Sequence, residues 1–404
     1  MVLYKNLTRV FVRPAFSRAM SSSLPAVVAV LYQAIDPPEI NGVKKPRKPG
    51  GYKDSGSDIA YILQQRNIQV ITPSATPSPT TQEGWCFPDT EDGILSAVQR
   101  GATHLWANTI VFASHPLQIS SKLSPHLRVV GQPPILTEIF DDKAYLNQKL
   151  SEANDSFPMP RSWRIDAGNH NAETVIKSID QYPIVAKPVR GRGSYGVKMC
   201  RTRDELEKHV ATLLPESPVV LLEEYLAGQE ATMTVMPPDV SSKDQHHWCL
   251  PPVVRFSHVD GVAPYSGTVA VTANSRAVMA SELEADSTAY GDMMDQCARV
   301  GDLIKTTAPI RIDVRRRSDG SEFVLFDINM KPACSFLFFS FLFLLQLTFV
   351  QNMTGPGRPG REDQASLTAL AAAELGWDYP TLLLKILQQA RTLGELRDYK
   401  SPFE

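Results

Sequence analysis

The stretch PIVAKPVRGRGSYGVK, residues 183–198, carries a lysine and three glycines in a pattern that could bind phosphate. Gly191, Gly193 and Gly196 follow the spacing G-x-G-x-x-G, and Lys187 precedes them. Amides of a glycine-rich loop can approach phosphate oxygens closely, and a lysine neutralises their charge. Three unrelated designs share this spacing: the dinucleotide-binding turn, the glycine loop of protein kinases and the loop of another ATP-using fold. Glycine clusters also form ordinary turns, so the flanking elements must decide.

The predicted elements on either side of the loop exclude two of these designs. A dinucleotide-binding turn needs a helix directly after the glycines. Here YPIVAKP predicts a strand and GVKMCR predicts a second one, and a helix begins only at Thr202, where TRDE forms a capping box. In kinases the lysine follows the loop, and neither H-R-D nor D-F-G occurs in this chain. The remaining design is a two-stranded hairpin that covers the phosphates of ATP. Lys187 would neutralise the α and β phosphate groups, and the backbone amides of residues 192–195 would close over the β and γ groups.

With this arrangement the chain resembles the ATP-grasp superfamily, and within it the D-alanine–D-alanine ligase-like branch. The resemblance covers about residues 135–375 and is carried by four motifs. These are FDDK (140–143), VAKPVRGRGSYGV (185–197), LLEEYLAGQE (221–230) and IRIDVRRRSDGSEFVLFDINMKP (310–332). The resemblance implies an α/β (α+β) ATP-grasp fold, and the ATP-binding residues that it implies are Lys143, Lys187, Gly191, Gly193, Ser194, Gly196, Glu223, Glu224, Leu226 and Glu230.

The same resemblance assigns roles within the nucleotide site. Glu223 would accept the adenine amino group, the backbone of residues 224–226 would meet the ring, and Glu230 would bind the ribose hydroxyls. Lys143 and Lys187 would hold the phosphates.

The last motif would supply the metal site and a catalytic arginine. The resemblance implies that Asp313, Asp327 and Asn329 bind Mg²⁺ or Mn²⁺, and that Arg311 acts with Lys187 in catalysis by stabilising developing negative charge. Asp327 and Asn329 share one face of a strand, and Asp313 can lie opposite on its neighbour. Carboxylate and amide oxygens suit Mg²⁺. Polar groups on a strand that otherwise reads FVLF are costly to bury unless something binds them.

The rest of the chain predicts the scaffold for these residues. Strand-like AVVAVLYQA, IQVITP, ATHLWANT and LRVVGQPP alternate with helical segments, which implies a small parallel α/β domain over residues 26–138. One of its helices is expected to start at a Ser57 cap. We expect a lid domain over residues 139–215 and a metal-bearing domain over residues 216–404, where ASLTALAAAEL and YPTLLLKILQQARTL predict helices that cover a sheet.

Composition limits the class of protein. The 404 residues are 43% hydrophobic and 21% charged, as in ordinary soluble proteins. A net charge of −2 argues against general affinity for nucleic acid or anionic membranes. The five cysteines form no C-x-x-C motif and are interpreted as reduced thiols.

The first 24 residues differ from the rest. Four basic residues and no acidic one precede Asp36, which is the composition of a mitochondrial transit peptide. The alternative is translation from Met20, so mitochondrial and cytoplasmic locations both stay open.

The segment ACSFLFFSFLFLLQLTFVQ, residues 333–351, interrupts the family pattern between the metal strand and its loop. A membrane helix, a core helix and a translated unspliced intron are the three interpretations, and the third is favoured because joining Pro332 to Asn352 restores the motif. Beyond it, Arg358 and Arg361 lie on a glycine-rich loop where a substrate carboxylate or phosphate could bind; exposed solubility charges are the alternative.

These features predict an ATP- and Mg²⁺-dependent ligase that joins a small carboxylate to an amine or a thiol through an acyl phosphate. The alternatives are an ATP-binding regulatory protein without turnover and a direct phosphoryl transferase. No nucleic-acid or membrane partner is expected, a homodimer is left open, and the dipeptide substrate of the D-alanine enzymes is not carried over.

Overall fold

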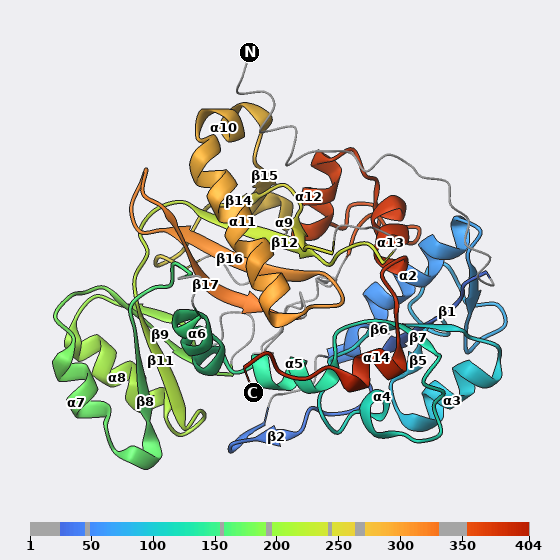
Figure 1. Cartoon of the computed structure of the whole chain (residues 1–404), viewed down its shortest axis with the longest axis horizontal. Helices are drawn as coiled ribbons and strands as arrows, with labels where there is room; N and C mark the ends of the chain where they lie inside the picture. The colour runs from blue at the N-terminus through green and yellow to red at the C-terminus, as the bar shows by residue number, and fades with distance from the viewer. Residues whose placement is uncertain are drawn as a thin grey trace, which may run out of the picture.

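The computed structural model describes residues 25–44, 49–153, 157–190, 196–240, 245–262, 271–330 and 354–403. The expectations for residues 1–24 and 333–351, and those for Gly191, Gly193 and Ser194, lie outside the described residues. The described chain forms three sheets with helices packed on them, and a separate two-stranded hairpin (Figure 1). The mixed α/β architecture that the sequence predicts is confirmed.

The N-terminal sheet is the predicted parallel one. Its strand order is β18-β7-β6-β1-β4, with β5 also paired to β1, and only β18 runs antiparallel. The strands are β1 (Val27–Tyr32), β4 (Gln69–Ile71), β5 (Phe87–Pro88), β6 (His104–Asn108), β7 (Arg128–Val130) and β18 (Arg391–Thr392). The accompanying elements are β2 (Glu39–Ile40), β3 (Val43–Lys44), η1 (Pro49–Tyr52), α2 (Lys53–Gln65), α3 (Glu91–Gln99), α4 (Pro116–Ile119), α5 (Pro134–Phe140) and α14 (Leu393–Asp398). The chain therefore returns to this sheet at its C-terminal end.

The predicted start of helix α2 at Ser57 is wrong. The helix begins at Lys53, after Tyr52 in the left-handed region, and Ser57 lies inside it. The Ser57 hydroxyl donates to the carbonyls of Lys53 and Gln82, at 2.6 and 2.9 Å. A serine inside a helix can satisfy its hydroxyl on the preceding turn, so a cap residue type alone did not locate the start.

The second sheet, at the lower left of Figure 1, covers the predicted lid domain and also includes β11, beyond the predicted boundary at residue 215. Its order is β10-β9-β11-β8, all antiparallel. The elements are β8 (Ser162–Asp166), η2 (Ala167–Asn169), α7 (Ala172–Ser178), β9 (Ile184–Pro188), β10 (Lys198–Cys200), α8 (Arg203–Leu213) and β11 (Val219–Glu224). Strands β9 and β10 pair antiparallel across the glycine segment, with Ala186 opposite Lys198. The hairpin that excluded a dinucleotide-binding turn is thus present.

The third sheet lies in the predicted metal-bearing domain and has the order β15-β14-β12-β16-β17, with β13 on β12. Its strands are β12 (Glu230–Met236), β13 (Trp248–Cys249), β14 (Val253–Arg255), β15 (Ser275–Ala277), β16 (Ile310–Arg316) and β17 (Phe323–Asn329). The helices of this part of the chain are α9 (Val271–Asn274), α10 (Ala280–Ala285), α11 (Ser287–Ile304) and α12 (Leu367–Glu374). Helix α13 (Tyr379–Leu387) packs against α12 and against α2 of the N-terminal domain. Helix α11 packs on β12 and β13, and α12 contacts β12, β14 and β15.

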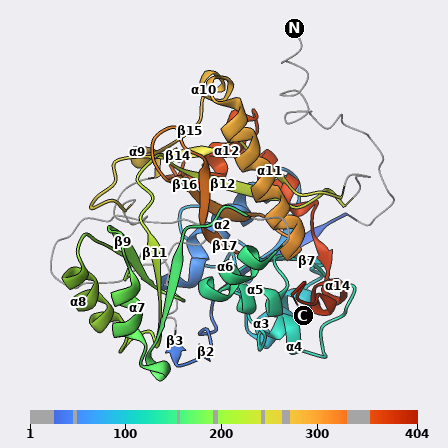
Figure 2. The ribbon, with the colours of Figure 1, turned by 60° about the vertical axis from the view of Figure 1, so that its left-hand side comes forward.

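Helix α6 (Lys143–Glu152) lies between the lid and the metal-bearing domain (Figures 1 and 2). Asp142 caps its N-terminus by accepting the amide of Tyr145 at 3.0 Å. Leu146 and Leu150 anchor the helix in the core of the metal-bearing domain. Because that core is shared with α11, β12, β16 and β17, α6 is held firmly against the strands that carry the candidate site.

Two smaller expectations can also be assessed in the described part of the chain. Cys86, Cys200, Cys249 and Cys297 are free and buried, as expected of reduced thiols. Among the described helices, none has the length and hydropathy needed to cross a bilayer.

Candidate functional site

Strands β16 and β17 bring together the residues of the predicted metal site. Asp313 lies opposite Asp327, and Arg311 lies opposite Asn329, with a register shift after Asp313. Because side chains two residues apart share a strand face, the four side chains lie on one side of this pair. The Asp-x-Asn spacing therefore predicted the juxtaposition correctly.

Asp313 is held by two neighbours. The Thr232 hydroxyl on β12 donates to Asp313 Oδ1 at 2.7 Å, and Arg311 Nη2 donates to Oδ2 at 3.2 Å. Asp313 is almost fully buried, so these contacts fix its orientation. Thr232 was missed by the sequence reasoning, because a threonine in a buried strand carries no signal of its own.

Replacing Thr232 with valine is expected to weaken metal-dependent nucleotide binding by about tenfold. Residues that hydrogen-bond to a metal-ligating side chain typically contribute 10–100-fold to metal affinity. The measurement is calorimetric binding of ATP at graded Mn²⁺ concentrations. Thr234→Val is the matched control, since Thr234 is buried on the same strand but contacts Thr368 at 3.1 Å. Equal losses in both variants would contradict the role given to Thr232.

Asn329 is oriented by Asp327. The amide nitrogen of Asn329 donates to Asp327 Oδ2 at 3.2 Å. A carboxylate can only accept, so the nitrogen must face Asp327 and the amide oxygen is left for another partner. An amide oxygen beside two carboxylates is a ligand set that suits a hard divalent cation.

The two predicted phosphate lysines reach this acidic cluster from helix α6 and strand β9. Lys143, at the start of α6, forms an ion pair with Asp327 Oδ1. Lys187, on β9, lies 2.7 Å from Glu223 Oε2 and donates to the Phe326 carbonyl at 3.0 Å. The lid lysine is therefore directly beside the strand that carries Asp327, although the two are far apart in sequence.

The charges of the lysines dominate the electrostatics of the site. Burial raises the pKa of Asp327, but the charges of Lys143 and Lys187, a hydrogen bond from Lys143 and the charge of Arg311 outweigh it and leave the pKa at about 2. Burial lowers the pKa of Lys143, and the charge of Asp327 more than reverses this. Asp327 is thus ionised and Lys143 protonated at neutral pH.

The adenine-side residue Glu223 lies at the end of β11 and is almost fully buried. Besides Lys187, it contacts Asn147 of α6, whose amide nitrogen donates to Glu223 Oε1 at 3.1 Å. The sequence analysis missed Asn147. Its position four residues after Lys143, on the same helical face, was the available signal.

Glu224 and Leu226 follow on the same connection. The Glu224 amide donates to the Arg161 carbonyl at 2.9 Å, and its side chain pairs with Arg317. Leu226 is buried. Their contacts with an adenine ring stay a prediction.

Glu230, the predicted ribose ligand, lies at the start of β12 and is surrounded by basic side chains. His258 Nε2 lies 2.8 Å from Oε2, Arg255 Nη1 lies 3.3 Å from Oε1, and Arg315 Nη1 lies 3.6 Å from Oε2. Burial raises the pKa of Glu230, but the hydrogen bond from His258 and the positive charges of Arg255 and Arg315 outweigh burial and hold the pKa below its usual value. The carboxylate is ionised, and ribose binding by Glu230 stays a prediction.

Of the predicted glycine-loop residues, only Gly196 lies within the described residues. It adopts φ +70, and an added Cβ would lie 2.9 Å from Leu213 Cδ2. Both the positive φ and the close packing favour glycine there.

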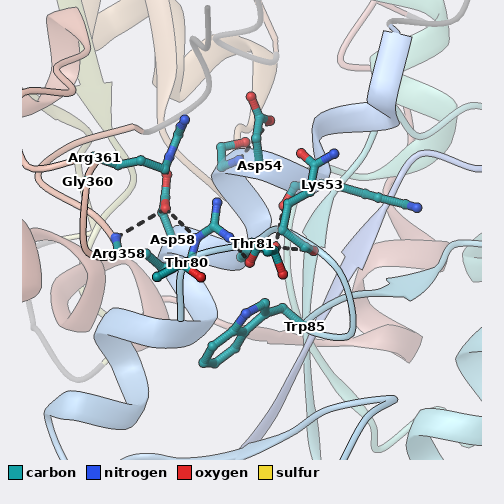
Figure 3. A network of polar contacts seen from close by, with 12 residues as sticks. Lys53, Asp54, Asp58, Thr80, Thr81, Trp85, Arg358, Gly360 and Arg361 are labelled. Atoms are coloured by element: carbon teal, nitrogen blue, oxygen red, sulfur yellow. Dashed lines mark hydrogen bonds and ion pairs between the residues drawn. The ribbon is translucent and has the colours of Figure 1, made fainter. Parts of the chain in front are cut away.

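Arg358 and Arg361 both form ion pairs with Asp58. Both guanidinium groups turn toward Asp58 of α2, which is fully buried (Figure 3). Arg358 Nε donates to Asp58 Oδ1 and Arg361 Nε donates to Oδ2, each at 2.8 Å. Arg358 also donates to the Thr81 carbonyl. The structure therefore places these arginines in an ion cluster with α2, and their contact with a substrate stays a prediction.

The residues present fit a metal–nucleotide complex. Lys143, Lys187 and Arg311 face Asp313, Asp327 and Glu223, a balanced set of three cations and three carboxylates. Within the described ranges, no three His, Cys, Asp or Glu side chains form a metal cage. Two carboxylates and an amide instead leave coordination positions for phosphate oxygens, as Mg²⁺ sites commonly do.

Part of the chain is similar to known proteins. Residues 158–342 match the family model described as D-ala D-ala ligase C-terminus. A D-alanine–D-alanine ligase of Gloeobacter violaceus is 29% identical over 150 residues, 37% of this chain and 45% of the relative. The corresponding protein of Halalkalibacterium halodurans is 24% identical over 151 residues, covering 37% and 47%. The matched segment thus spans under half the length of these curated relatives.

Solved structures match over more of the chain. The D-alanine–D-alanine ligase of Bacillus anthracis complexed with ATP has a TM-score of 0.57 and 13% identity, over 92% of this chain and 98% of that one. The VanG D-Ala:D-Ser ligase of Enterococcus faecalis has a TM-score of 0.56 and 12% identity, covering 90% and 98%. At such identities the likeness concerns the fold.

Proposed function

We propose that this chain is an ATP-dependent ligase that joins a small carboxylate to an amine or a thiol, in line with its similarity to the D-alanine–D-alanine ligase-like branch of the ATP-grasp fold. One observation carries the proposal. Lys187, on strand β9 of the hairpin, lies beside the strand that carries Asp327, and Lys143 pairs with Asp327 directly.

The proposed reaction transfers the γ-phosphoryl group of ATP to the substrate carboxylate, and an amine or thiol then displaces phosphate from the acyl phosphate. Two anions must approach each other, so charge has to be neutralised from several sides. Lys143 and Lys187 would leave their carboxylate partners and bind phosphate oxygens. Arg311, already on the same strand face as Asp313, would donate to the oxygen on which negative charge develops.

Mg²⁺ is proposed as the metal. Asp313, Asp327 and the Asn329 amide oxygen would hold it, and when bound it would neutralise the transferring phosphates. Support comes from the orientation of Asn329, whose amide nitrogen is taken by Asp327. Glu223 and Glu230 would fix the base and the ribose.

The test is release of ADP from Mg·ATP in the presence of candidate carboxylic acids and hydroxylamine. The proposal predicts ADP together with a hydroxamate, because hydroxylamine intercepts an acyl phosphate. Direct phosphoryl transfer would give ADP and a stable phosphorylated product without hydroxamate. Tight ATP binding with no ADP under any acid would instead favour the regulatory protein.

A further inference from the structure

Asn147, on helix α6, is a buried residue outside the predicted site. It lies on α6 one helical turn after Lys143, so the two side chains share a helical face. Lys143 contacts Asp327 at the metal end of the site, and Asn147 contacts Glu223 at the other. Helix α6 thus touches both ends of the candidate nucleotide site.

The contact has a defined direction. Glu223 Oε2 lies 2.7 Å from Lys187 Nζ, and a carboxylate only accepts hydrogen bonds. The amide nitrogen of Asn147 must therefore be the group that faces Glu223 Oε1, at 3.1 Å. Both side chains are buried, with exposures of 7% for Asn147 and 3% for Glu223, which makes the loss of this donor costly.

The two donors to Glu223, Lys187 and Asn147, differ in whether they are also proposed to bind phosphate. Lys187 holds Oε2 but is also the proposed phosphate ligand, so its hold on Glu223 weakens when phosphate competes for the ammonium. Asn147 is uncharged and is not a proposed phosphate ligand, so its contact with Glu223 does not compete with phosphate. A carboxylate has about four acceptor positions, so one position on each oxygen stays open for a ligand after both donors bind.

We propose that Asn147 is a positioning residue that orients Glu223 for recognition of a 6-amino purine, an inference that rests on the proposed nucleotide site. With Oε1 held by Asn147, the carboxylate presents an acceptor to an exocyclic amino group. A 6-oxo purine places a carbonyl oxygen there instead, which the carboxylate repels. Without Asn147 the carboxylate turns away, and the preference between the two bases falls.

The experiment compares the calorimetric affinities of Mg·ATP and Mg·ITP for the full chain and its variants. Wild type is expected to prefer ATP by about tenfold or more, the size of one hydrogen bond to a charged group. Asn147→Ala and the near-isosteric Asn147→Asp are expected to lose most of this preference, mainly through weaker ATP binding.

Gln148→Ala is the matched control. Gln148 is the neighbouring amide on α6, but it is exposed and donates to Glu152 at 2.7 Å. Its ATP-to-ITP ratio should equal that of wild type. Melting temperatures without nucleotide would be recorded for every variant, since a merely structural role lowers both affinities and leaves their ratio unchanged.

An unchanged ratio in both Asn147 variants would overturn the inference while leaving the proposed function intact. Failure of wild type to bind either nucleotide would instead overturn the proposed function, and the inference with it.

Discussion

Replacing Lys187 with methionine is expected to lower Mg·ATP-dependent ADP formation by about 100–1000-fold, the usual cost of removing one charge-stabilising donor from a transition state. Lys187 is almost fully buried between Glu223 and the Phe326 carbonyl, where no solvent-exposed lysine can replace it. ADP formation would be measured with the acids that form hydroxamates in wild type.

The variant also leaves Glu223 buried without its nearest counter-charge, so stability has to be measured separately. Lys187→Arg keeps the charge and should fold better while remaining strongly impaired, because a planar fork does not reproduce a point ammonium. Lys198→Met, on the adjacent strand β10 with an exposed side chain, is the control and should keep activity. A folded Lys187→Met enzyme with more than about a tenth of wild-type turnover would contradict the assigned role.

Replacing Asp58 with asparagine is expected to lower the free energy of unfolding by about 3–5 kcal/mol, because it removes the carboxylate from a buried ion pair. Arg358 and Arg361 would keep their charges with no anion between them. The packing is tight here, since a Cβ on Gly357 would lie 2.4 Å from Asp58 Cγ. Urea unfolding measures the change.

Asp54→Asn serves as the control on the same helix. Asp54 accepts the Ser55 amide at 2.8 Å, a local contact at the start of α2. Its substitution is expected to change stability by under about 1 kcal/mol. If Asp58→Asn were no more destabilising than Asp54→Asn, the cluster would not be what ties the 354–361 loop to α2.

Much of the site could be predicted because its signals are local in sequence. The order strand, glycines, strand identified the hairpin around Lys187, and the i, i+2 spacing of Asp327 and Asn329 identified a shared strand face. The pairing of Asp313 with Asp327 followed from two strands joined by a short turn. The shared face of Asp327 and Asn329 follows from the two-residue periodicity of side chains along a strand.

The contacts that were missed depend on tertiary neighbours. The sequence around Asp58 does not predict that Arg358 and Arg361 will surround it, because these arginines lie about 300 residues further along the chain, in another predicted domain. Asn147 and Thr232 are uncharged residues whose importance appears only when Glu223 and Asp313 lie beside them. Likewise, the basic side chains around Glu230 come from β14, β16 and the segment after β14, and spacing along one strand cannot reveal this arrangement.

The central claim is that the lysines and the acid–acid–amide cluster hold one metal–triphosphate complex between them. The most direct test is calorimetric binding of ATP with Mg²⁺ and with EDTA, in wild type and in an Asp313→Asn/Asp327→Asn double variant. We predict that Mg²⁺ tightens ATP binding to wild type by at least about tenfold and has little effect on the double variant. An equal effect of Mg²⁺ on both proteins, or no effect on wild type, would contradict the claim.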